Sequence, residues 1–289
     1  MSQPEFKQDL SQTREPGGPF VVNLFFSEPV PQPSREQLLA VLGRHVGSVG
    51  CFCYDDKVMG LEARDYVSHF KEADLPPQLM VMSCIEYDTA RLRPFERSQM
   101  WDCPNREEVL ADCHYTVVAT DMMAFMPPGE RAALTMDFLE ALVELYPSCR
   151  AVYLPLSGKL HLPQDIREHD VPREDRFIRF AVNARFFNIQ GGEDMLVDTL
   201  GLGTLYLPDL QYHFHGMDPN WVVNHAYCTA SYILANENPF KNGDTVDGIV
   251  DGHFEQSIQW RCRYEGSLIQ PSREVLDIYM NEYAAGQRK

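Results

Sequence analysis

Three histidines lie close together in the segment LQYHFHGMDPNWVVNHAY. His213 and His215 are two residues apart, so on a strand both side chains project to the same face. His225 follows on an expected helix. Three histidine ligands with one open position are typical of a zinc or iron centre that activates water. The spacing is compatible with a metal site of His213, His215 and His225, with Asp209 or Asp218 beside it as a supporting carboxylate.

The same residues also fit a corner in which a strand packs against a helix. Tyr212 and Phe214 alternate with the two strand histidines, as in a half-buried strand. Asp218 can cap the helix that follows, and Pro219 suits the first helical position, where its missing N–H breaks no bond. In this interpretation the histidines make hydrogen bonds inside the corner, and the protein needs no cofactor. The sequence leaves both interpretations open, and we favour the packed corner.

Other motifs that could carry chemistry are incomplete. LSGKL lacks the first glycine of a phosphate-binding loop, and the chain has no GxSxG, HExxH or helix-opening GxGxxG. Arg179 and Arg185 are six residues apart in a stretch with strand composition, so they could share a face and hold a carboxylate or phosphate. Salt bridges are the more common use of such arginines in a very acidic protein. No motif therefore identifies a reaction.

Hydrophobic patterns place helices and strands around these residues. A capping box of Ser34 and Gln37 begins one helix, and Pro127 and Pro128 open another, whose apolar stripe runs from Ala132 to Tyr146. A third helix covers 219–236, the stretch 238–252 is expected to be a loop, and 273–286 is expected to be a helix that ends at Gly286. Apolar runs predict strands at 20–26, 49–63 (two strands), 78–87, 113–125, 149–156, 177–190 and 254–265.

These elements predict an α+β fold of two mixed α/β modules, each a mostly antiparallel sheet with helices packed on one face. We expect a mobile N-terminal arm over 1–19, an N-terminal module over 20–160, a linker over 161–176 and a C-terminal module over 177–289. A single large domain is the alternative for a chain of this length.

The charge balance limits the classes of partner. The chain has 25 Lys plus Arg against 42 Asp plus Glu, a formal net charge of -17. Such a field repels phosphate backbones, so nucleic acid is not an expected ligand, whereas a basic protein is a reasonable one. The first nineteen residues lack the apolar stretch of a signal peptide, and no apolar run is long enough to cross a membrane. We therefore expect a cytoplasmic protein with reduced cysteines and no membrane partner.

Several motifs resemble those of a bacterial family of domains of unknown function. They are TLGL and LPDLQYHFHG within 199–216, then DPN, VNHAY and finally GDTVDG, which ends at Gly248. The stretches LFFSEPV, YTVVATDMMA and AVYLPLSGKL are similar too, so the resemblance covers nearly the whole chain. The C-terminal half is also loosely similar to suppressor-of-fused-like proteins, many bacterial members of which are thought to be immunity or interaction proteins. The resemblance implies architecture and bacterial origin, because a fold does not determine an activity.

Two functional hypotheses follow. The first is a non-enzymatic protein-binding protein, immunity-like, a chaperone or an adaptor, whose acidic surface binds a basic partner. The alternative is a metal-dependent hydrolase with zinc or iron at His213, His215 and His225. We favour the first, because the chain lacks a complete catalytic signature while its charge suits a basic partner.

Overall fold

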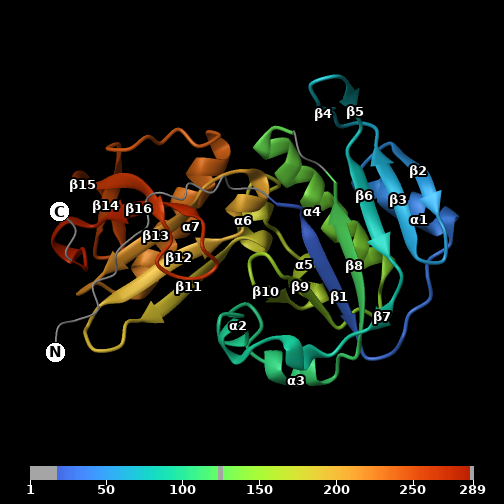
Figure 1. The fold of residues 1–289 in the computed structure, drawn as a ribbon, viewed down its shortest axis with the longest axis horizontal. Helices are drawn as coiled ribbons and strands as arrows, with labels where there is room; N and C mark the ends of the chain where they lie inside the picture. The colour runs from blue at the N-terminus through green and yellow to red at the C-terminus, as the bar shows by residue number, and fades with distance from the viewer. Residues whose placement is uncertain (1–17, 123–125, 287–289) are drawn as a thin grey trace. The chain divides into compact units, whose positions relative to one another are not determined.

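The computed structural model describes residues 18–122 and 126–286, and these fall into two compact units (Figure 1). The N-terminal unit is Pro19–Ala181, and the C-terminal unit begins at Val182. The expected arm over 1–19 lies almost entirely outside the described residues. None of the described helices is both long and apolar enough to cross a membrane.

The N-terminal unit is built on an antiparallel sheet. Its strands are β1 (Val21–Phe26), β2 (Val49–Tyr54), β3 (Val58–Ala63), β6 (Gln78–Met82), β7 (Ile85–Glu86), β8 (Tyr115–Asp121), β9 (Ala151–Leu154) and β10 (Lys159–His161). Within the described residues the order is β10-β9-β1-β8-β6-β3-β2, with β7 also paired to β8. A separate hairpin consists of β4 (Ser68–His69) and β5 (Asp74–Leu75).

Helices pack against both faces of this sheet. They are α1 (Arg35–His45), α2 (Pro94–Ser98), α3 (Arg106–Ala111), α4 (Pro128–Leu145), α5 (Pro163–Arg167) and α6 (Arg176–Ala181), with a short 3-10 helix η1 (Thr89–Arg91). Neighbouring residues of β1 show the two contacts. Phe26 packs edge-on against Tyr146 at the end of α4, and Phe25 joins a core cluster with Met100 and Leu110. Burial on both faces explains why β1 is a nearly continuous apolar run, interrupted at Asn23.

The predicted starts of α1 and α4 are confirmed. Ser34 Oγ accepts a hydrogen bond from the backbone N–H of Gln37 at 3.2 Å, and the Gln37 side chain accepts one from Ser34 N–H at 3.1 Å. The whole predicted stripe of α4 is buried, from Ala132 to Tyr146. The same helix also buries Arg131, whose Nη2 lies 2.8 Å from Asp121 Oδ2 on β8. The periodic apolar stripe of α4 did not predict this buried ion pair between Arg131 and Asp121.

The C-terminal unit contains a mixed sheet with one long helix. Its strands are β11 (Asn183–Asn188), β12 (Met195–Leu200), β13 (Asp209–Phe214), β14 (Thr245–Val250), β15 (His253–Gly266) and β16 (Glu274–Tyr279), and its helices are α7 (Pro219–Ala235), η2 (Leu202–Leu205) and η3 (Asn281–Tyr283). In the described residues the strand order is β11-β12-β13-β16-β15-β14. β13 and β16 run parallel and the other pairs antiparallel. α7 packs against β11, β12 and β13.

Both sheets with packed helices confirm the predicted α+β class. Two predicted elements are wrong in type. The expected strand over 177–190 is the helix α6 followed by β11, and the expected helix over 273–286 is the strand β16 followed by η3. A third prediction, the loop over 238–252, missed β14.

The β14–β15 hairpin, residues 245–266, turns at Asp251 and Gly252. Both residues have positive φ, 49° and 81°, as a two-residue type I′ turn requires. The register shifts between Asp247 and Gly248, where a Cβ on the glycine would lie 2.5 Å from Ile258. Residues 256–258 of β15 are the extra residues at this shift, and glycine in β14 leaves the space that Ile258 occupies.

Candidate functional site

The histidine segment folds as the predicted corner. β13 ends at Phe214, and α7 begins with Pro219 at its first position. Asp218 caps this helix, because its Oδ1 accepts a hydrogen bond from Asn220 N–H at 2.8 Å. The carboxylate of Asp218 is thus occupied at the helix start and does not serve as a partner for a histidine.

His225 is buried in the contact between α7 and the sheet. Its Nδ1 lies 2.9 Å from the Tyr212 hydroxyl, and its Nε2 lies 2.8 Å from the backbone oxygen of Asp247. The carbonyl can only accept, so Nε2 carries the proton and Nδ1 accepts from the tyrosine. Burial lowers the pKa of His225 to about 4. The neutral ring is therefore a packed hydrogen-bonding group at neutral pH.

His213 faces the other side of the sheet from Tyr212, since neighbouring residues on a strand alternate. Its Nε2 lies 3.7 Å from Asp194 Oδ2. His215 lies just beyond β13 and is exposed. Throughout 18–122 and 126–286, no group of three or more His, Cys, Asp or Glu side chains could hold a metal ion. The structure does not bring His213, His215 and His225 together, so the geometry gives no support to the metal hypothesis.

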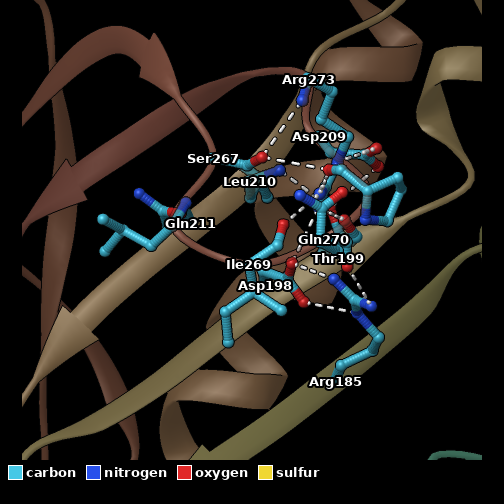
Figure 2. A network of polar contacts seen from close by, with 12 residues as sticks. Arg185, Asp198, Thr199, Asp209, Leu210, Gln211, Ser267, Ile269, Gln270 and Arg273 are labelled. Atoms are coloured by element: carbon cyan, nitrogen blue, oxygen red, sulfur yellow. Dashed lines mark hydrogen bonds and ion pairs between the residues drawn. The ribbon is translucent and has the colours of Figure 1, made fainter. Parts of the chain in front are cut away.

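Asp209 belongs to a buried polar network on the sheet face opposite α7 (Figure 2). The Arg185 guanidinium forms a two-pronged ion pair with Asp198, at 2.8 Å from Nε to Oδ1 and 2.5 Å from Nη2 to Oδ2. Arg273 bridges two carboxylates, with Nη2 2.8 Å from Asp198 Oδ2 and Nε 3.0 Å from Asp209 Oδ2. Thr199 joins them, because its hydroxyl lies 3.2 Å from Asp209 Oδ1.

Strand register aligns this network across the sheet. Arg185 is paired with Asp198, Asp198 with Gln211, and Gln211 with Asp277, so one row of side chains crosses β11, β12, β13 and β16. The Gln211 amide lies 3.1 Å from Asp277 Oδ1 and 3.3 Å from Glu265 Oε1. All five side chains are nearly inaccessible to solvent.

The network fixes the loop 267–273 onto the sheet. Gln211 Oε1 accepts a hydrogen bond from Leu268 N–H at 2.7 Å, and Arg185 donates to the backbone oxygen of Gln270 at 3.0 Å. Burial raises the pKa of Asp209, although Arg273 acts against the shift. Burial would lower the pKa of Arg273, but Asp209 and Asp198 outweigh it and raise that pKa. The arginine and carboxylate side chains thus hold one another inside the unit by hydrogen bonds, which is an architectural arrangement.

Comparison with known families gives a match to residues 198–279. The chain contains a DUF4261 domain. The family is described as a domain of unknown function, so the match supplies a relationship and no activity. No curated protein and no solved structure matches the chain.

The DUF4261 domain begins at Asp198 and ends at Tyr279, so it holds every member of the network except Arg185. The motifs TLGL and LPDLQ supply Thr199, Asp209 and Gln211 to the network. These motifs therefore build the interior of the domain. Arg273 was missed by sequence reasoning, which placed it at the start of a helix.

The LSGKL segment also proves structural. It forms a turn, and Lys159 is buried at the start of β10. Its Nζ donates to the backbone oxygen of Arg179 at 2.5 Å and lies 3.3 Å from Asp102 Oδ2. Burial lowers the pKa of Lys159 to about 8. Arg179, which was expected to share a strand face with Arg185, instead lies on α6 and pairs with Asp102 at 2.9 Å.

Proposed function

We propose that this chain is a non-enzymatic protein-binding protein that recognises a basic partner through the β14–β15 hairpin. The observation that carries the proposal is the combination of exposed apolar and acidic side chains at a free sheet edge. Phe254 is 51% exposed and Val250 is 46% exposed, although both are large apolar residues. Exposed apolar groups bordered by polar ones are typical of interaction sites.

The charge of the hairpin supports a basic partner. The tip of the hairpin, residues 245–260, contains Asp247, Asp251 and Glu255 but no lysine or arginine, whereas Arg261 and Arg263 lie beyond the tip on β15. Asp251 and Glu255 are exposed, and Asp247 is half-buried. A partner with lysine or arginine side chains would gain both faster association and orientation from this field.

The geometry of the hairpin supports recognition by a surface that is already ordered before the partner binds. β14 is the last strand of the sheet order, so its outer edge has no strand partner among the described residues. Behind it, the Phe254 ring lies 5.0 Å from the His225 ring, and Gly252 lies close against Trp221. Phe254 is thereby supported from one side and exposed on the other, as suits an aromatic anchor.

An immunity-like role is the more specific form of this proposal. Its support is the loose sequence resemblance to suppressor-of-fused-like proteins, and it requires that the basic partner be a toxin that the chain neutralises. A chaperone or adaptor role would use the same hairpin with another basic protein. Co-expression of this chain with its partner distinguishes these roles. Only an immunity protein restores growth to cells that produce a toxic partner.

Site-specific photo-crosslinking in the native host tests the proposal. A benzoyl-phenylalanine placed at position 254 is expected to give one discrete adduct with a protein of high isoelectric point. The matched control is the same residue at Phe95, which is 45% exposed in the N-terminal unit. Adducts that are equal at both positions, or absent at 254, would count against the hairpin as the binding surface.

A further inference from the structure

One face of the N-terminal sheet is packed against helices over only part of its width. Near β9 and β10, Phe25 and Tyr153 lie in a core cluster with Leu110 of α3. β2, β3 and β6 lie at the other end of the strand order (Figure 1). There the side chains on this face are half-buried or exposed, whereas those on the opposite face are buried. We call this part, over β2, β3, β6 and the adjoining residues of β8 and β1, the open face.

Strand register shows which residues share the open face. Val21 projects to the same side of β1 as Phe25, since residues an even number apart on a strand share a face. One row of paired residues then crosses β1, β8, β6 and β3: Val21, Thr120, Met80 and Gly60. β2 bulges at Phe52, and a Cβ on Gly60 would lie 2.5 Å from Phe52 Cε2. The Phe52 ring therefore covers Gly60 and completes the row.

The open face is largely apolar. Its apolar members are Val21, Phe52, Val58, Met80, Met82 and Val118. Phe52 is 50% exposed, and Met122, which directly follows β8, is 60% exposed. An antiparallel sheet with one side in water normally carries polar residues on that side. The composition of the open face is instead typical of a sheet that packs against a second layer.

The charge of the open face indicates what this second layer is. Along these strands the face carries one charged residue, Glu62, whose Oε1 lies 2.6 Å from Arg64 Nη2. The ion pair leaves the face neutral in a chain with a net charge of -17. A basic partner would gain nothing from such a face. Two copies of the chain, which repel each other through their net charge, meet here without bringing like charges together.

The size of the open face predicts a weak association. Five strands about 4.8 Å apart, each with about five residues at about 3.3 Å, span about 20 Å by 17 Å, or about 350 Å². Two such faces bury about 700 Å² in total, which is less than the roughly 1,200–2,000 Å² of stable interfaces. A complex formed by this face alone should therefore exchange readily with the monomer.

We propose that the open face binds the open face of a second copy, so that two N-terminal units pack sheet on sheet about a two-fold axis. Two-fold dimers are the most common homo-oligomers, and each uses one surface that is complementary to itself. The flexible side chains of Met80 and Met82 can interdigitate with those of the other copy. The dimer goes beyond the proposed function, because the hairpin and its carboxylates take no part in it.

Sedimentation equilibrium of the full chain tests this dimer in low and in high sodium chloride. A monomer–dimer equilibrium with a Kd of about 0.1 mM is expected. The higher salt should lower the Kd, because it screens the repulsion between two acidic chains and weakens no charge pair across the face. Salt has the opposite expected effect on the hairpin and its basic partner, so the failure of one proposal leaves the other standing.

Substitution of Met80, in the middle of the row, tests the face itself. Met80→Glu should raise the Kd about tenfold or more, since each copy brings an unpaired carboxylate to the interface. Met80→Thr should raise the Kd about threefold, because apolar contact is lost. Threonine suits a half-buried strand, so this second variant decides the question if the glutamate variant does not fold.

The matched control is Leu75→Glu, which adds the same charge to an exposed residue of β5, outside the open face. It should dimerise as the wild type does. The proposal is overturned if the wild type stays monomeric up to about 0.5 mM, about five times the expected Kd. It is also overturned if Met80→Thr dimerises as well as Leu75→Glu, or if salt weakens the association.

Discussion

Replacement of Asp198 by alanine is expected to lower the free energy of unfolding of the C-terminal unit by about 3–5 kcal/mol. The carboxylate binds the buried guanidinium of Arg185 with two hydrogen bonds and that of Arg273 with a third. Alanine leaves Arg185 with the Gln270 carbonyl and a contact to the Phe187 ring, neither of which neutralises its charge. An arginine buried without a counter-ion is the source of the large effect.

The measurement is urea unfolding monitored by the hydrogen exchange of backbone amides in β12 and β13. These amides report on the C-terminal unit separately from the N-terminal unit. Asp112→Ala is the matched control, because it removes an exposed carboxylate that pairs with Arg150. The control should change stability by less than about 1 kcal/mol. Equal effects of the two substitutions would show that the network does not hold the domain together.

Acidification from pH 7 to pH 4 is expected to destabilise the C-terminal unit by about 3 kcal/mol through His225 alone. Its pKa is about 4 when folded, against an ordinary value of 6.5, because the ring is buried. In that range the unfolded chain takes up a proton on this residue and the folded chain does not. The free energy of unfolding therefore falls as the pH falls through 6.5 towards 4.

His225→Gln should remove this part of the pH dependence, because an amide does not titrate. Its carbonyl and NH2 can replace the bonds to the Tyr212 hydroxyl and the Asp247 carbonyl. His253→Gln is the control, since this histidine is exposed on β15. Urea unfolding at several pH values makes the comparison, and an unchanged profile for His225→Gln would contradict the assignment of a buried neutral ring.

Local signals in the sequence were sufficient to predict helix starts where they agreed with the tertiary environment. The capping box at Ser34, the two prolines at the start of α4 and the Asp218–Pro219 helix start all act within a few residues, so the sequence alone located them. The type I′ turn at Asp251 and Gly252 carries an equally local signal, the Asp-Gly pair, which was assigned to a loop instead.

The elements that were predicted wrongly depend on partners that are distant in sequence. The aromatic and β-branched residues near Phe177 favour a strand, but Lys159 and His161 donate to the last carbonyls of α6, at Arg179 and Phe180, and stabilise a helix end. β16 lies between β13 and β15 and is buried on both faces, so its apolar residues do not alternate as they would on an edge strand.

The candidate site could be predicted only in part for the same reason. A strand with His213 and a helix with His225 were expected, but His215 lies just beyond the strand, and α7 packs on the Tyr212 face while His213 lies on the other. Which face a helix covers is set by the sheet and not by the spacing of the histidines. Arg273 reaches Asp198 and Asp209 from a loop far along the chain, which no local pattern encodes.

The most direct test of the account is the affinity of the partner crosslinked at position 254 for the wild type and for Phe254→Ser. Calorimetry with the purified partner should give a Kd that is at least about tenfold higher for the variant and that rises with salt for the wild type. Loss of one aromatic anchor and screening of the hairpin carboxylates account for these changes. An unchanged Kd in Phe254→Ser, or binding that salt does not weaken, would contradict recognition of a basic partner by this hairpin.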